Sequence, residues 1–114
     1  MILSKNAFVD EHIKHPEKII NKIKRGRKLS EVFIVCLADD ESRLEIISSK
    51  MFFFKYFRER NYVVSGLFKG KDDALEYIRC LTEISFSEFG SFEPKTAISE
   101  IEVSKISERF YSEN

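Results

Sequence analysis

The chain has 114 residues, the size of an ordinary domain, and 43% of them are hydrophobic, enough for one modest core. Charged residues make up 33% and are balanced in sign, a composition that excludes an intrinsically disordered chain. The formal net charge is zero, but residues 1–30 hold eight Lys and Arg against three Asp and Glu, so a basic N-terminal region precedes an acidic body.

We expect a single domain over residues 1–114, in which the basic N-terminal region, residues 1–28, is helical. Ser4 can cap a short first helix that carries Phe8, Val9 and Ile13. Pro16 predicts the start of a second helix, residues 16–25, because proline fits the first helical turn. Gly26 can end this helix, and its apolar stripe consists of Ile19, Ile20 and Ile23.

Three strands are predicted in the middle of the chain. Residues 32–37 are continuously apolar, so both faces of this strand need cover and it should be central in its sheet. The acidic stretch 38–42 is typical of a turn with solvated charges, and residues 43–48 can return as the second arm of a hairpin. Residues 61–70 form the third strand.

The strongest helix pattern follows the third strand and ends at Gly90. Asp73 and Glu76 have the spacing of a capping box, and the apolar face consists of Ala74, Tyr77, Ile78, Leu81 and Ile84. Beyond Pro94, residues 97–103 alternate in a way that fits either an edge strand or a helix, and Ser104 can begin a short last helix.

Together these elements predict an α+β fold. We expect a small antiparallel sheet of three to four strands with helices packed on it. The order is α-β-β-α-β-α, and a further C-terminal strand at residues 95–103 is left open.

The stretch "MFFFKYF", residues 51–57, is the densest aromatic segment. As a helix or as a continued strand, it would carry apolar side chains on more than one side, and soluble monomers rarely leave such surface exposed. Three covers are conceivable: other segments of the chain, a second copy in a homodimer, or a ligand in a pocket. The interface or pocket candidates are Phe52, Phe53, Tyr56 and Phe57.

Two basic stretches are candidate anion contacts. The stretch "KIKRGRK" is a basic patch made of Lys22, Lys24, Arg25, Arg27 and Lys28. It lacks interleaved aromatic residues and the whole chain is neutral, so we do not expect nucleic acid to be the main partner. In "GLFKGKD", residues 66–72, Lys69 and Lys71 lie between a strand and a helix, where anions can bind, but the spacing is one residue short of a P-loop.

No motif in the sequence identifies an enzyme or a cofactor. His12 and His15 with Asp10 and Glu11 are too few and too interrupted by Pro16 for a metal site, so we assign no metal ligands. Neither a nucleophile elbow nor a carboxylate pair is convincing, because the stretch "DDE" at residues 39–41 is typical of a solvated turn. Cys36 and Cys80 are expected to be buried free thiols.

The blocks "RLEIISSKMFFF", "NYVVSGLFKGKDDALEYI" and "GSFEPKTAIS" occur in an order that resembles a group of small, uncharacterised single-domain proteins of Gram-positive bacteria. The resemblance covers residues 43–99, with departures at Ser65 and Phe68, and implies a bacterial origin without implying an activity. The first residues lack the apolar stretch of a secretory signal, so we expect a cytoplasmic protein with no membrane contact.

These observations favour a non-enzymatic interaction or regulatory module that self-associates, as a dimer, through the aromatic segment, with a further protein partner left open. One alternative is a ligand-binding protein or enzyme with a pocket between the sheet and the aromatic segment, where Lys69 or Lys71 contacts an anion. A second alternative is nucleic-acid binding through the basic N-terminal helix and loop.

Overall fold

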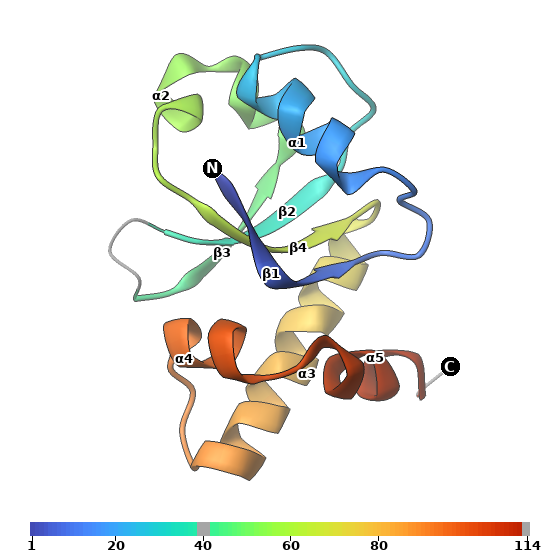
Figure 1. The fold of residues 1–114 in the computed structure, drawn as a ribbon, viewed down its shortest axis with the longest axis vertical. Coiled ribbons are helices and arrows are strands. Elements are labelled where there is room, and N and C mark those ends of the chain that lie inside the picture. Colours follow the sequence, from blue (N-terminus) through green and yellow to red (C-terminus); the bar gives the residue numbers. More distant parts are fainter. Residues whose placement is uncertain (39–41, 113–114) are drawn as a thin grey trace.

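The computed structural model describes residues 1–38 and 42–112. A four-stranded mixed sheet lies in the middle of the molecule and helices cover both of its faces (Figure 1). The strands are β1 (Ile2–Val9), β2 (Phe33–Leu37), β3 (Leu44–Ser48) and β4 (Val63–Phe68). The helices are α1 (Pro16–Lys24), the 3-10 helix η1 (Ser49–Phe53), α2 (Lys55–Arg58), α3 (Lys71–Phe89), α4 (Pro94–Glu100) and α5 (Val103–Ser112).

The sheet has the order β1-β4-β2-β3, with β2 and β4 in the centre. β2 pairs antiparallel with both β3 and β4, as Val35 opposite Ile46 and opposite Gly66 illustrates. The predicted hairpin of β2 and β3 and the central place of the apolar strand are therefore confirmed. The α+β class is confirmed as well.

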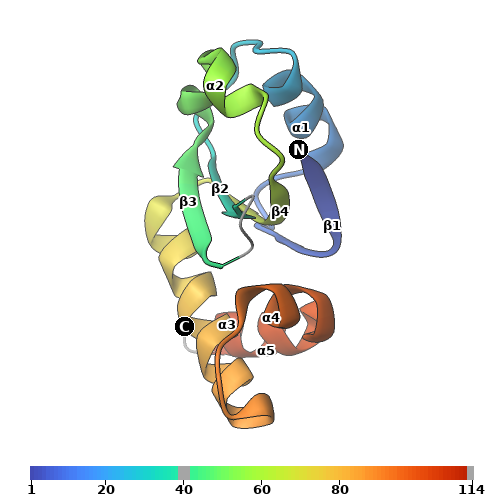
Figure 2. The same ribbon diagram turned by 90° about the vertical axis from the view of Figure 1, so that its left-hand side faces the viewer.

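Each face of the sheet packs on its own layer of helices (Figure 2). On one face, Val35 and Leu37 of β2 join Phe8, Phe68 and the buried residues of α3, α4 and α5. On the other face, Ile34 and Cys36 of β2 join the buried residues of α1 and η1. Since successive side chains of a strand point to opposite faces, the continuous apolar run of β2 supplies both cores.

The prediction of helix at the N-terminus is wrong, because residues 2–9 form β1. β1 runs parallel to β4, so the sheet is mixed and not antiparallel throughout. Backbone hydrogen bonds close both ends of this pairing: Ile2 N donates to Tyr62 O and Asp10 N donates to Leu67 O, each at 2.9 Å. These partners are about sixty residues away in sequence, so no local pattern reveals them.

The ends of α1 and α3 are formed by the predicted glycines, but the start of α3 differs from the prediction. Gly26 has φ +63°, and its N–H donates to Ile23 O while Arg27 N donates to Lys22 O, which is a Schellman ending of α1. Gly90 ends α3 in the same left-handed region, with φ +76°. The predicted capping box is wrong, because α3 begins at Lys71 after Gly70 and no side chain caps it.

The sequence left open whether residues 95–103 form a strand or a helix, and the structure shows helix α4 at Pro94–Glu100. Pro94 occupies the first turn of α4, and Ala97, Ile98 and Ile101 are buried against the core that α3 forms on the sheet. Among the described residues, no strand follows β4. The predicted turn at 38–42 includes residues 39–41, which lie outside the described residues.

In the part of the chain that the structure describes, no helix combines the length and the apolar character needed to cross a membrane.

Candidate functional site

The aromatic segment, residues 51–57, is neither one helix nor a continuation of β3. η1 ends at Phe53, and Phe54 has extended backbone angles, φ −83° and ψ 127°, before α2 begins at Lys55. Ser48 begins η1 by accepting a hydrogen bond from Lys50 N at 3.2 Å. The break at Phe54 divides the aromatic side chains between two short helices, so they point in different directions.

The segment contains one fully buried ring and three exposed ones. Phe52 is 1% exposed and packs edge to face on Tyr62 and Phe57, with ring centroids 6.0 and 6.2 Å away. Phe53, Phe54 and Tyr56 are 50%, 61% and 64% exposed. With Met51, which is 37% exposed, these three residues form what we call the aromatic patch.

Arg58 fixes the shape of the segment. Its Nη1 donates to Phe52 O at 2.9 Å and to Phe53 O at 2.7 Å, so it satisfies carbonyl groups at the end of η1. The same guanidinium lies against Gly26, where an added Cβ would come within 2.6 Å of Nη1. The ending of α1 and the aromatic segment are thus held together through one arginine.

The charges beside the aromatic patch have partners within the chain. Lys50 Nζ lies 4.0 Å from a Glu31 carboxylate oxygen, and Lys55 Nζ lies 3.6 Å from Glu59. The Arg60 guanidinium carbon lies 5.6 Å from the centroid of the Tyr56 ring, within the range of a cation–π contact. The patch therefore presents apolar rings among locally compensated charges.

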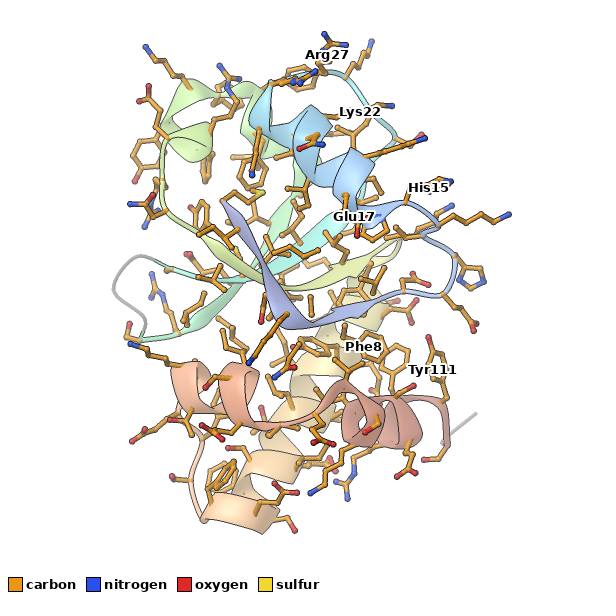
Figure 3. The ribbon with its side chains drawn as sticks, in the orientation of Figure 1. Phe8, His15, Glu17, Lys22, Arg27 and Tyr111 are labelled. Atoms are coloured by element: carbon orange, nitrogen blue, oxygen red, sulfur yellow. The ribbon has the colours of Figure 1, made fainter. Side chains whose placement is uncertain are left out.

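The residues of the basic patch predicted at 22–28 do not all line one pocket. Lys22 lines a pocket beside the loop that follows β1, whereas Lys24 lines a separate groove on the opposite side of α1 with Glu17. Arg25, Arg27 and Lys28 follow the last residue of α1 and line neither pocket; Figure 3 labels Arg27 beyond the end of this helix.

The two predicted anion contacts also separate. Lys69 follows β4 and lines the same pocket as Lys22, but Lys71 begins α3 and does not. Lys69 is therefore brought next to α1 and not next to the aromatic segment, where the sequence had placed its ligand. Phe52 and Tyr62 meet at the junction of that segment with the sheet.

Asp10 is an organising residue that the sequence analysis missed. It is 6% exposed, and its carboxylate accepts hydrogen bonds from His12 N and Lys69 N, both at 3.0 Å, while the His12 ring lies 2.9 Å away. Burial alone would raise the pKa of Asp10, but these hydrogen bonds outweigh it and the pKa lies below its ordinary value. Asp10 fastens the loop after β1 to the end of β4.

Within residues 1–38 and 42–112, no three His, Cys, Asp or Glu side chains are grouped so that they could hold a metal ion. Cys36 and Cys80 are both buried free thiols, as expected. Burial, with the nearby Glu45 charge, raises the pKa of Cys36 to about 12, so this thiol is not an activated nucleophile at neutral pH.

Comparison of the chain with protein-family models, with curated proteins and with solved structures gives no match. The resemblance of residues 43–99 to small proteins of Gram-positive bacteria stays a prediction.

Proposed function

We propose that this protein is a non-enzymatic interaction module of the cytoplasm that self-associates through the aromatic patch. The observation that carries the proposal is the exposure of Phe53, Phe54 and Tyr56, which are each half exposed or more although they lie within four consecutive positions. Soluble monomers rarely leave so much aromatic surface in water, and interface cores are rich in aromatic residues and Met.

A second copy of the chain is the partner that fits the charges best. Lys50 and Lys55 are paired with Glu31 and Glu59 of the same chain, so two patches can meet without unpaired like charges facing each other. In a two-fold dimer the same patch is used on both sides, which an uncharged aromatic surface allows. A stable interface buries about 800 Å² per partner, so the rest of η1 and α2 must also be covered.

Sedimentation velocity over a concentration series tests this proposal. We expect the wild-type protein to shift from monomer to dimer, and the double variant Phe54→Gln/Tyr56→Gln to stay monomeric, because the rings that drive association are removed. Phe52 is left unchanged, since its ring is buried in the core.

Leu75→Gln is the matched control, because Leu75 is 50% exposed on α3, away from the aromatic patch. It should dimerise like the wild type. A wild-type protein that stays monomeric up to about 0.5 mM, or a Leu75→Gln variant that weakens the dimer equally, would contradict the proposal.

A further inference from the structure

A pocket of about 440 Å³ lies between the loop that follows β1, the beginning of α1 and the segment that leads into β2. Its apolar lining consists of Ile13, Ile19, Leu29 and Val32, of which Ile13 and Val32 are buried. The volume falls within the range of sites for small ligands, which combine apolar walls with a few polar groups. This pocket is separate from the aromatic patch, and none of the patch residues lines it.

The polar lining of the pocket has one sign of charge. Four lysines and two histidines contribute to it, and no carboxylate does. These residues are His12, Lys14, His15, Lys18, Lys22 and Lys69. Among the described residues, the ammonium groups of the four lysines have no ion-pair partner.

The carboxylates near the pocket are directed elsewhere. Both oxygens of Asp10 accept hydrogen bonds from backbone N–H groups, and Glu11 does not line the pocket. Glu17 lines the groove on the other side of α1 and not the pocket, at an angle of about 100–140° around the helix axis from Lys18 and Lys22. Apart from Asp10, which contacts the His12 ring, the acidic residues of the N-terminal region therefore leave the lysines of the pocket without a partner.

Helix geometry places two lysines of the pocket next to each other, where their charges repel. Lys18 and Lys22 are four residues apart, so they lie along one face of α1, and His15 immediately precedes that helix. Like charges at such spacing repel each other. Lys69 approaches the same face from the end of β4, held by the bond from its N–H to Asp10. Lys22 gains from its place in the last turn of α1, but no carboxylate of the lining offsets the repulsion among the lysines.

We propose that this pocket binds a small phosphomonoester with an apolar body. Its dianionic head would be held by Lys18, Lys22 and Lys69. Its apolar body would cover Ile19 and Leu29, the partly exposed apolar side chains of the lining. Asp10 acts as a positioning residue, because it orients the backbone at His12 and Lys69 without lining the pocket.

The test is an NMR titration of the isotope-labelled full chain with phenyl phosphate at constant ionic strength. We expect saturable shifts of the backbone amides around Ile13, Lys18 and Lys69. Inorganic phosphate should bind about tenfold more weakly, because it lacks the apolar body, and benzyl alcohol should shift the same amides only weakly.

Two variants distinguish binding of phenyl phosphate in the pocket from nonspecific attraction to any surface lysine. Lys18→Gln/Lys22→Gln should weaken phenyl phosphate binding by about tenfold or more, because two of the cations that hold the head are lost. Lys28→Gln is the matched control, since Lys28 is exposed, lies just after α1 and does not line the pocket; its binding should change less than about twofold.

The proposal is overturned if phenyl phosphate gives no saturation below about 10 mM, or if Lys28→Gln weakens binding as much as the double variant. It is also overturned if a short single-stranded oligonucleotide binds more tightly than phenyl phosphate and shifts the amides of Arg25, Arg27 and Lys28. That result would favour the nucleic-acid alternative, for which several dispersed cations contact a backbone of phosphates.

Discussion

The two helical layers of this protein differ in how their exposed rings and charges are arranged. Both expose some aromatic surface, since Phe86 and Phe89 of α3 are 55% and 45% exposed. Around α3, α4 and α5 the aromatic rings pack on one another: Phe8 stacks on Phe68 at 5.7 Å and contacts Phe110 at 5.0 Å, and Phe8 and Tyr111 can be followed in Figure 3. The charges there are paired too, since Arg109 binds Glu83 and Arg79 binds Glu76.

The layer of α1, η1 and α2 concentrates its exposed rings in one short segment and carries lysines that have no carboxylate partner among the described residues. Phe53, Phe54 and Tyr56 are exposed on one part of it, and Lys18 and Lys22 carry uncompensated charge on another. Both layers cover the same sheet and both contain a buried core, so the difference concerns their outer surfaces. Both proposed sites, the aromatic patch and the pocket beside α1, therefore lie on the same side of the sheet.

The largest expected effect on the free energy of unfolding is the difference between replacing a buried ring and an exposed ring of the aromatic segment. Phe52→Ala should lower the free energy of unfolding by about 3–5 kcal/mol, because a fully buried ring leaves a cavity. Phe54→Ala should change it by less than about 0.5 kcal/mol in the monomer, because that ring is exposed. Urea denaturation at low protein concentration measures both, and equal losses would show that the patch is part of the core.

The second largest effect is expected at Gly26, because this residue ends α1 and lies against Arg58 of the aromatic segment's second helix. Gly26→Ala should cost about 2–3 kcal/mol, because φ +63° strains an L residue and the new Cβ displaces the Arg58 guanidinium from its carbonyl partners. Gly90→Ala is the control: its φ is +76° but nothing lies within 4 Å of the added Cβ, so only the strain remains. If urea denaturation gives the same loss for both, the Arg58 contact contributes nothing.

Removing the Asp10 carboxylate should cost about 1–3 kcal/mol at pH 7, because Asp10→Ala leaves the N–H groups of His12 and Lys69 without their acceptor. The folded pKa of Asp10 lies below the ordinary value of 3.8, so its stabilisation is present above pH 3.8 and is lost as the pH falls through the folded pKa.

Urea denaturation of wild type and Asp10→Ala from pH 7 down to about pH 3 checks this sign. The difference between the two proteins should shrink toward acid, and Asp10→Asn, which keeps one acceptor oxygen, should fall between them. A difference that grows toward acid would contradict the assignment of the bonds to Asp10.

The smallest effects should have opposite signs in the two layers. Arg109→Gln removes an ion pair with Glu83 and should cost up to about 0.5 kcal/mol. Lys22→Gln removes repulsion from Lys18 and should be neutral or stabilising by about 0.2–0.5 kcal/mol. Thermal unfolding at low salt measures both, and a clear loss for Lys22→Gln would mean that its charge already has a partner.

Part of the candidate sites was visible in the sequence. The density of aromatic residues at 51–57 identified the segment, but it could not tell buried Phe52 from exposed Phe53, because burial of Phe52 depends on packing against Tyr62, which lies outside the segment. Lys22 and Lys69 were each recognised as cations, but not as neighbours. Asp10 was missed because its hydrogen-bond donor at Lys69 is 59 residues away.

The sequence by itself determined the elements whose signals are local. The spacing of Ala74, Tyr77 and Leu81 defines α3, the two-sided apolar run of β2 requires cover on both faces, and Pro16 with Gly26 bounds α1. Only the tertiary structure decided that residues 2–9 form a strand and residues 94–100 a helix. Pairing with β4 and burial against the α3 core outweigh weak local preferences, because these long-range contacts supply more free energy than propensity does.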